Sequence, residues 1–142
     1  MKQFPQMVLL AATAFAANTA WAEWVAAVSA QNPVNMLTQQ QVADIYLARV
    51  AGFPDGALAL PVDLPAGTAV RKDFYRQVLH MNHRQLRQYW TRLLRQGGGQ
   101  PPKEIGTETD VKTLIADNPN IIGYLDRSQV DSRVKVVFSL PN

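Results

Sequence analysis

The stretch PVDLPAGTAVRKDFY, Pro61–Tyr75, joins a strand-like segment to a helix-like segment through a small turn, and this unit sets the fold class. An apolar run at residues 57–64 predicts a strand, and Ala66-Gly67-Thr68 opens a helix that is expected over residues 68–79. Arg71 and the lysine after it fall in the first turn of this helix, where the helix dipole disfavours positive charge. Residues that break such a local rule of helix stability often belong to a functional site.

The turn has the features of an anion site. A helix start leaves backbone N–H groups without intrahelical acceptors, and its dipole favours negative charge. Gly67 permits a ligand to approach the backbone, and the Thr68 hydroxyl can cap the helix or donate to a ligand oxygen. The expected ligand-binding residues are Ala66, Gly67, Thr68, Ala69 and Arg71. In the alternative, Asp63 or Asp73 pairs with Arg71 and nothing binds, and the spacing alone does not separate the two interpretations.

The other segments alternate between strand-like and helix-like patterns. Apolar runs predict strands at 23–30, 103–107, 120–125 and 134–140, and helical periodicity predicts helices at 37–50, 83–96 and 108–119. Thr38 is placed to cap the first of these helices. The alternation predicts a single α/β domain of three layers, with a mostly parallel sheet flanked by helices.

The first 22 residues read as a secretory signal peptide. Lys2 precedes an apolar run from Met7 to Ala16, and the small residues of Ala20-Trp21-Ala22 suit cleavage after Ala22. Cleavage leaves a mature α/β domain of 120 residues, 23–142, which is expected in the periplasm. The alternative is a buried N-terminal helix. No later segment is long and apolar enough to span a membrane, and the absence of cysteine excludes disulfides and a lipid-modified cysteine anchor.

Positive charge gathers in the middle of the chain. Eight basic residues lie between Arg71 and Lys103, against one acidic residue, Asp73. On the helix expected at 83–96, Leu86, Tyr89, Trp90, Leu93 and Leu94 fall on one side, and Arg84, Arg87, Arg92 and Arg95 fall on the other. Arginines opposite an apolar stripe usually keep a helix soluble. A nucleic-acid surface is not expected, because the aromatic residues point to the core. Contact with a protein or an anionic surface stays open.

Signals for catalysis are weak. The two histidines, His80 and His83, are three residues apart across the helix break expected at HMN, and they have neither a cysteine nor a nearby carboxylate to complete a metal site. The serines lie outside any nucleophile-elbow pattern. We therefore expect no enzyme activity, no catalytic residue, no metal and no cofactor.

The order of four segments resembles the phosphate-binding proteins of ABC importers. These segments are LTQQQVADIYLAR, PVDLPAGTAVRKDFYRQVL, YWTRLLRQGGGQPP and NPNIIGYL, and the similarity runs from about Trp24 to Phe138. The resemblance implies a type 2 periplasmic-binding-protein fold (a PBP-like domain). The family's two lobes need more than twice this length, so it also implies a short, single-lobe member.

Two positions depart from the family pattern. The family's Ser-Gly-Thr turn falls on Ala66-Gly67-Thr68, so the first hydroxyl is missing, and an arginine of the family falls on Val62. Gly67 and Thr68 match, and Arg71 is placed to substitute for the lost charge. The resemblance implies a substrate-binding protein for inorganic phosphate or a similar oxyanion, in phosphate uptake or sensing, whose missing lobe a second copy or another protein would supply. The alternative is a periplasmic interaction protein that docks a periplasmic or membrane protein partner without a small ligand.

Overall fold

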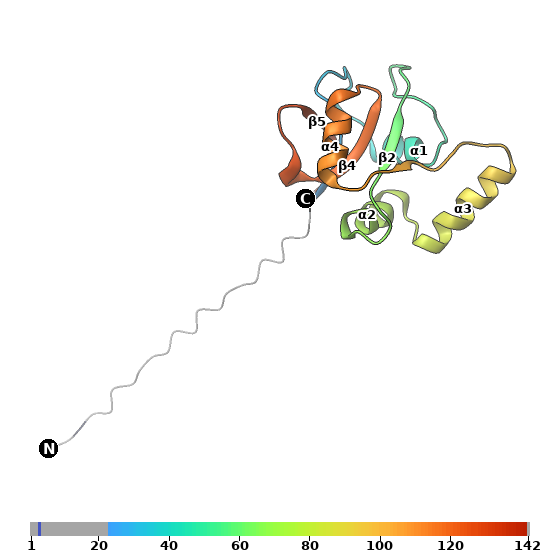
Figure 1. Ribbon diagram of the computed structural model, residues 1–142. Coiled ribbons are helices and arrows are strands. Elements are labelled where there is room, and N and C mark those ends of the chain that lie inside the picture. Colours follow the sequence, from blue (N-terminus) through green and yellow to red (C-terminus); the bar gives the residue numbers. More distant parts are fainter. Residues whose placement is uncertain (1–2, 4–22, 142) are drawn as a thin grey trace.

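The sheet contains five strands in the order β3-β2-β4-β1-β5 in the computed structural model, which describes residue 3 and residues 23–141. The predicted signal peptide lies outside the described residues, apart from Gln3. The strands are β1 (Trp24–Ser29), β2 (Leu60–Asp63), β3 (Lys103–Glu104), β4 (Ile121–Asp126) and β5 (Val134–Ser139). Figure 1 shows them as one open sheet with helices around it.

Strand direction is mixed. β2 is parallel to β3 and β4, whereas β1 is antiparallel to both of its neighbours, β4 and β5. Four strands therefore run in one direction and β1 runs against them. The predicted α/β architecture is confirmed, and the direction of β1 is a detail that the sequence pattern did not indicate. All six β1 residues are buried, as in a central strand, and a continuous apolar run predicts such burial without predicting direction.

The helices are α1 (Gln39–Tyr46), α2 (Ala69–Phe74), α3 (His83–Arg95) and α4 (Glu108–Asp117), with a π-helical segment η1 (Tyr75–Leu79) and a 3-10 turn η2 (Arg127–Gln129). Three of the four α-helices of the described residues, α1, α3 and α4, begin at a residue whose side chain caps the helix. Thr38 Oγ1 accepts a hydrogen bond from the Gln41 amide at 3.1 Å, and the Gln41 side chain accepts one from the Thr38 amide at 2.8 Å. This reciprocal pair confirms the predicted cap of α1.

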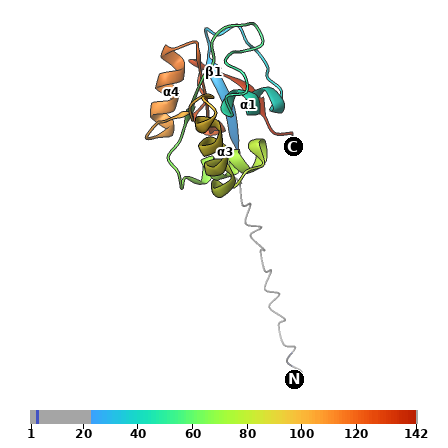
Figure 2. The same cartoon turned by 90° about the vertical axis from the view of Figure 1, so that its right-hand side faces the viewer.

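Side chains of β4 show which helices cover which face of the sheet. Gly123 faces Val111 and Ile115 of α4. Its neighbour Tyr124 points to the other face, where its ring stacks on Phe74 of α2 with the centroids 4.1 Å apart. Figure 2 shows α4 and α1 on opposite sides of the sheet. The domain thus has three layers, with α4 on one face and α1, α2 and η1 on the other.

The helix predicted over residues 68–79 is formed by α2 and η1 together. The change from α-helical to π-helical bonding occurs at Tyr75, and the segment ends at His80, which has a φ of 52°. A residue in the left-handed region cannot continue a right-handed helix. The predicted break at HMN is therefore confirmed.

Helix α3 extends away from the sheet (Figure 1) and is held by few side chains. Leu86 and Trp90 are buried, and the Tyr89 hydroxyl donates a hydrogen bond to the Leu47 carbonyl at 2.6 Å. The prediction that Leu94 faces the core is wrong, because Leu94 is 54% exposed. It lies in the last turn of α3, where the core does not cover the apolar side. Within the described residues, none of the helices is long and apolar enough to cross a bilayer.

We predict that Gly123→Ala destabilises the domain by about 1–3 kcal/mol, because overpacking a core forces its neighbours to shift. A Cβ atom at this position would lie 2.8 Å from both Ile115 Cδ1 and Val111 Cγ1. Gly106→Ala is the matched control, since the nearest atom to its new Cβ would be 3.7 Å away. Urea unfolding measures both variants, and equal stability of the two would contradict close packing between β4 and α4.

Candidate functional site

The turn predicted to bind an anion, Ala66-Gly67-Thr68, lies between the end of β2 and the start of α2, and we call it the elbow. Gly67 has a φ of +101°, a conformation that favours glycine, and it is exposed together with Ala66. The amide and the hydroxyl of Thr68 both donate to the Pro65 carbonyl, at 3.2 and 2.9 Å. Thr68 therefore stands at the N-cap position of α2 without capping it.

Arg71 turns back toward the end of β2, and its side chain is only 14% exposed. Its Nη1 donates a hydrogen bond to the Leu64 carbonyl at 2.8 Å. The same nitrogen lies 3.7 Å from Asp63 Oδ2 and 3.6 Å from Glu104 Oε2, and the guanidinium stands 5.0 Å from the centroid of the Tyr75 ring. The carboxylates of Asp63 and Glu104 thus compensate the positive charge of Arg71, which the helix dipole disfavours. The pairing of Asp63 with Arg71 is one of the two alternatives that the sequence left open.

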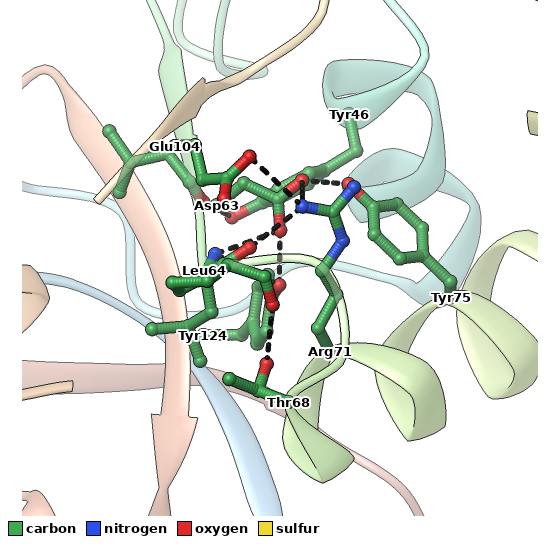
Figure 3. Close-up of polar contacts among 10 residues, drawn as sticks. Tyr46, Asp63, Leu64, Thr68, Arg71, Tyr75, Glu104 and Tyr124 are labelled. Atoms are coloured by element: carbon green, nitrogen blue, oxygen red, sulfur yellow. Dashed lines mark hydrogen bonds and ion pairs between the residues drawn. The ribbon is translucent and has the colours of Figure 1, made fainter. Parts of the chain in front are cut away.

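Asp63 is the centre of this group of polar residues (Figure 3). Its carboxylate is 3% exposed and accepts hydrogen bonds from the hydroxyls of Tyr75 and Tyr124. The Leu64 amide also donates to Asp63 Oδ1, at 2.9 Å. These donors come from β4, η1 and the chain after β2, so the network ties the sheet to the helix layer.

Burial sets the protonation of this network. It raises the pKa of Asp63, and the hydrogen bonds from Tyr124 and Tyr75, together with the Arg71 cation, oppose that rise. Burial also raises the pKa of both tyrosines, and the Asp63 carboxylate raises it further. The two hydroxyls therefore keep their protons and stay donors. Such a satisfied network positions the backbone around it.

A cavity of about 880 Å³ opens beside the elbow, between α2, η1 and the start of α3. Of the five predicted ligand-binding residues, Ala66, Gly67 and Arg71 line it, whereas Thr68 and Ala69 do not. The other charged or titratable side chains of its wall are Lys72, Tyr75, Arg76, His80 and His83. Its lining residues include no aspartate or glutamate, so the electrostatic potential inside favours an anion.

Sequence reasoning missed several parts of this site. Tyr75, Tyr124 and Glu104 carry no pattern that links them to Asp63, which the sequence indicates only as one of two alternative partners of Arg71. The start of α3 was also missed as a cavity wall, because helical periodicity does not show how two helices approach each other. Val62, where the resemblance places an arginine, is buried, and its carbonyl accepts the Tyr46 hydroxyl at 2.8 Å.

Three solved structures illustrate which proteins share this fold. One, from Clostridium perfringens, is described as a phosphate ABC transporter substrate-binding protein and holds bound phosphate; it matches with a TM-score of 0.65 and 22% identity over 81% of this chain and 44% of its own. An ABC-type phosphate transport receptor from Vibrio cholerae matches with a TM-score of 0.65 and 19% identity over 81% and 45%. PstS from Borrelia burgdorferi matches with a TM-score of 0.62 and 12% identity; the match covers 84% of this chain and 49% of PstS.

These similarities establish the fold, which is that of a periplasmic-binding-protein lobe. The chain spans about half the length of the solved structures that it matches. No protein-family model and no curated protein sequence matches it.

We predict that Tyr124→Phe lowers the free energy of unfolding by about 1.5–3 kcal/mol, because a hydrogen bond to a buried charged group is lost. Tyr89→Phe is the control: its hydroxyl donates to a neutral carbonyl, that of Leu47, so the expected loss is about 0.5–1.5 kcal/mol. Urea unfolding at neutral pH compares the two variants. A smaller loss for Tyr124→Phe than for Tyr89→Phe would show that the Asp63 network does not stabilise the fold.

The raised pKa of Asp63 predicts a pH dependence of stability. The unfolded chain loses this proton near the ordinary aspartate value of 3.8, whereas the folded protein holds it to higher pH. Stability contributed by Asp63 is therefore present below that value and is lost as pH rises through the folded pKa. Urea unfolding across this range should show the wild type losing stability relative to Asp63→Asn. A relative gain with rising pH would mean that the tyrosine and arginine donors lower the pKa.

Proposed function

We propose that this protein is a periplasmic solute-binding protein that binds phosphate or a similar oxyanion, in phosphate uptake or sensing. The observation that carries the proposal is the cavity beside Gly67, whose wall combines exposed elbow backbone with basic side chains and contains no carboxylate. A cleft lined by one sign of charge concentrates ligands of the opposite sign. The fold shared with phosphate-binding proteins supports the same ligand class.

The side chains available to an anion differ from those expected from the sequence. Arg71 lines the cavity and is already engaged by Asp63, Glu104 and the Leu64 carbonyl. Lys72 is exposed and forms no ion pair among the described residues, so its ammonium group is free to meet a ligand. Arg76 lines the cavity with an exposed side chain that pairs with Asp73 at 3.0 Å. We therefore assign ligand contact to Lys72 and Arg76, beside the elbow, and a positioning role to Arg71.

We predict that Arg76→Gln weakens phosphate binding by about tenfold, which is 1.4 kcal/mol. Arg49→Gln is the matched control, because Arg49 is also an exposed arginine paired with one aspartate, Asp44, and it lies outside the cavity wall. Calorimetric titration with phosphate and sulfate measures affinity. Thermal unfolding gives a second readout, since ligand at 100 times its dissociation constant stabilises by about 2.7 kcal/mol. No response of the wild type to any oxyanion at millimolar concentration would remove the proposal.

The engagement of Arg71 favours a second candidate function. With its guanidinium neutralised by Asp63 and Glu104, the elbow itself offers an anion no free charge. A single lobe of this kind would then act as an interaction protein that docks a periplasmic or membrane protein. Capture of the same partners by wild type and by a variant with glutamate at Arg84, Arg87, Arg92 and Arg95 would exclude α3 as the docking face.

A further inference from the structure

The arginines of α3 differ from the other arginines of the described chain. Those outside α3 are each within 4 Å of a carboxylate; they are Arg49, Arg71, Arg76, Arg127 and Arg133. The α3 arginines are exposed, and none of them forms an ion pair with a described residue; they are Arg84, Arg87, Arg92 and Arg95. We call these four the α3 arginine row. A chain that pairs its other arginines leaves this row to an outside partner.

The row lines an open surface of about 680 Å³ along one face of α3, which we call the groove; all of its lining residues belong to this helix or its C-cap. The other side chains of the groove are neutral and polar; they are Gln88, Thr91 and Gln96. With a rise of 1.5 Å per residue, the guanidinium groups from Arg84 to Arg95 are spread over about 16 Å of helix. A guanidinium plane binds a phosphate or carboxylate through two parallel N–H groups. The groove therefore suits a ligand with several negative groups in a line.

The groove and the cavity meet at the first turn of α3. His83 lines the cavity and Arg87 lines the groove, and residues four apart on a helix are neighbours about 6 Å apart. Gln85 of the cavity and Gln88 of the groove are neighbours in the same way, three residues apart. The cavity beside Gly67 and the groove are therefore neighbours at the start of α3.

The dimensions of the cavity and the groove together exceed the needs of a single small anion. Cavities of about 300–1,000 Å³ accommodate drug-sized molecules, and the cavity alone falls in that range before the groove is added. The row also lacks a stacking platform for nucleic-acid bases, because Trp90 is buried and the Tyr89 hydroxyl is bonded to Leu47. A chain of phosphates without bases matches both the length and the chemistry.

We infer that the α3 arginine row binds a chain of linked phosphate groups, such as inorganic polyphosphate, whose end occupies the cavity beside Gly67. The cavity end rests on the proposed function, and the row itself is an independent surface. Each added phosphate meets a further guanidinium, so affinity rises with chain length and falls with salt.

The test compares orthophosphate, tripolyphosphate and long-chain polyphosphate by calorimetry at two salt concentrations. The variant is Arg87→Gln with Arg92→Gln; its control, Arg127→Gln with Arg133→Gln, removes two charges from arginines outside the groove. We expect long chains to bind the wild type at least tenfold more tightly than orthophosphate. The α3 variant should bind long chains about tenfold more weakly than the wild type, and its affinity for orthophosphate should be unchanged. The slope of log affinity for long chains against log salt concentration should become shallower by about 1.4. The control should change by less than about twofold.

The outcomes separate this inference from the proposed function. Two results overturn the inference and leave the proposed function standing. One is orthophosphate binding with no higher affinity for longer chains, and the other is an equal loss of long-chain affinity in the variant and the control. Long-chain binding that needs Arg87 and Arg92, without orthophosphate binding, supports the row and overturns the proposed function. Polyglutamate bound as tightly as polyphosphate overturns the assignment to phosphates in favour of an acidic peptide. Binding only to phosphatidylglycerol vesicles overturns it in favour of a membrane surface.

Discussion

The buried carboxylate of Asp63 constrains the whole region around the candidate site. A charge or polar acid taken out of water is costly unless several donors meet it, and here the donors come from three parts of the chain. Tyr124 reaches it from β4, Tyr75 from η1 and the Leu64 amide from the chain after β2, with the Arg71 cation close by. Because these groups converge on one side chain, the end of β2 and the start of α2 hold a fixed relation. The cavity wall at Gly67 is built on that relation.

Local patterns predicted most of the secondary structure and little of the network. The cap at Thr38 and the break at His80 depend on residues close in sequence, so single segments revealed them. Tyr124 lies 61 positions from Asp63, and nothing in either segment indicates that they meet. Leu94 was misplaced for a related reason: helical periodicity identifies the side of a helix, but it does not show how far the core extends beneath it.

At the elbow, too, the sequence predicted the features that depend on neighbouring residues and not those that depend on residues far along the chain. Gly67 adopts the positive φ that its turn position suggested, and Arg71 lies close to it, as part of the same cavity wall. The charge balance around Arg71 was not predictable, because Glu104 comes from the edge strand β3. The cavity itself needs the start of α3, which follows the turn at His80 and supplies part of its wall. Its basic character follows from the sequence, since the chain between Asp73 and Glu104 contains no acidic residue.

The short pairing between β2 and β3 leaves part of a strand edge open. β3 covers only Val62 and Asp63, so Leu60 and Pro61 have a partner on the β4 side alone. Leu58 and Leu60 are about half exposed there, which would invite another chain to extend the sheet. The Leu60 amide points to Asn120, so position 61 faces the open side, and proline has no N–H to offer. A foreign strand arriving at this border therefore finds a missing donor, and the protein resists edge-to-edge aggregation there.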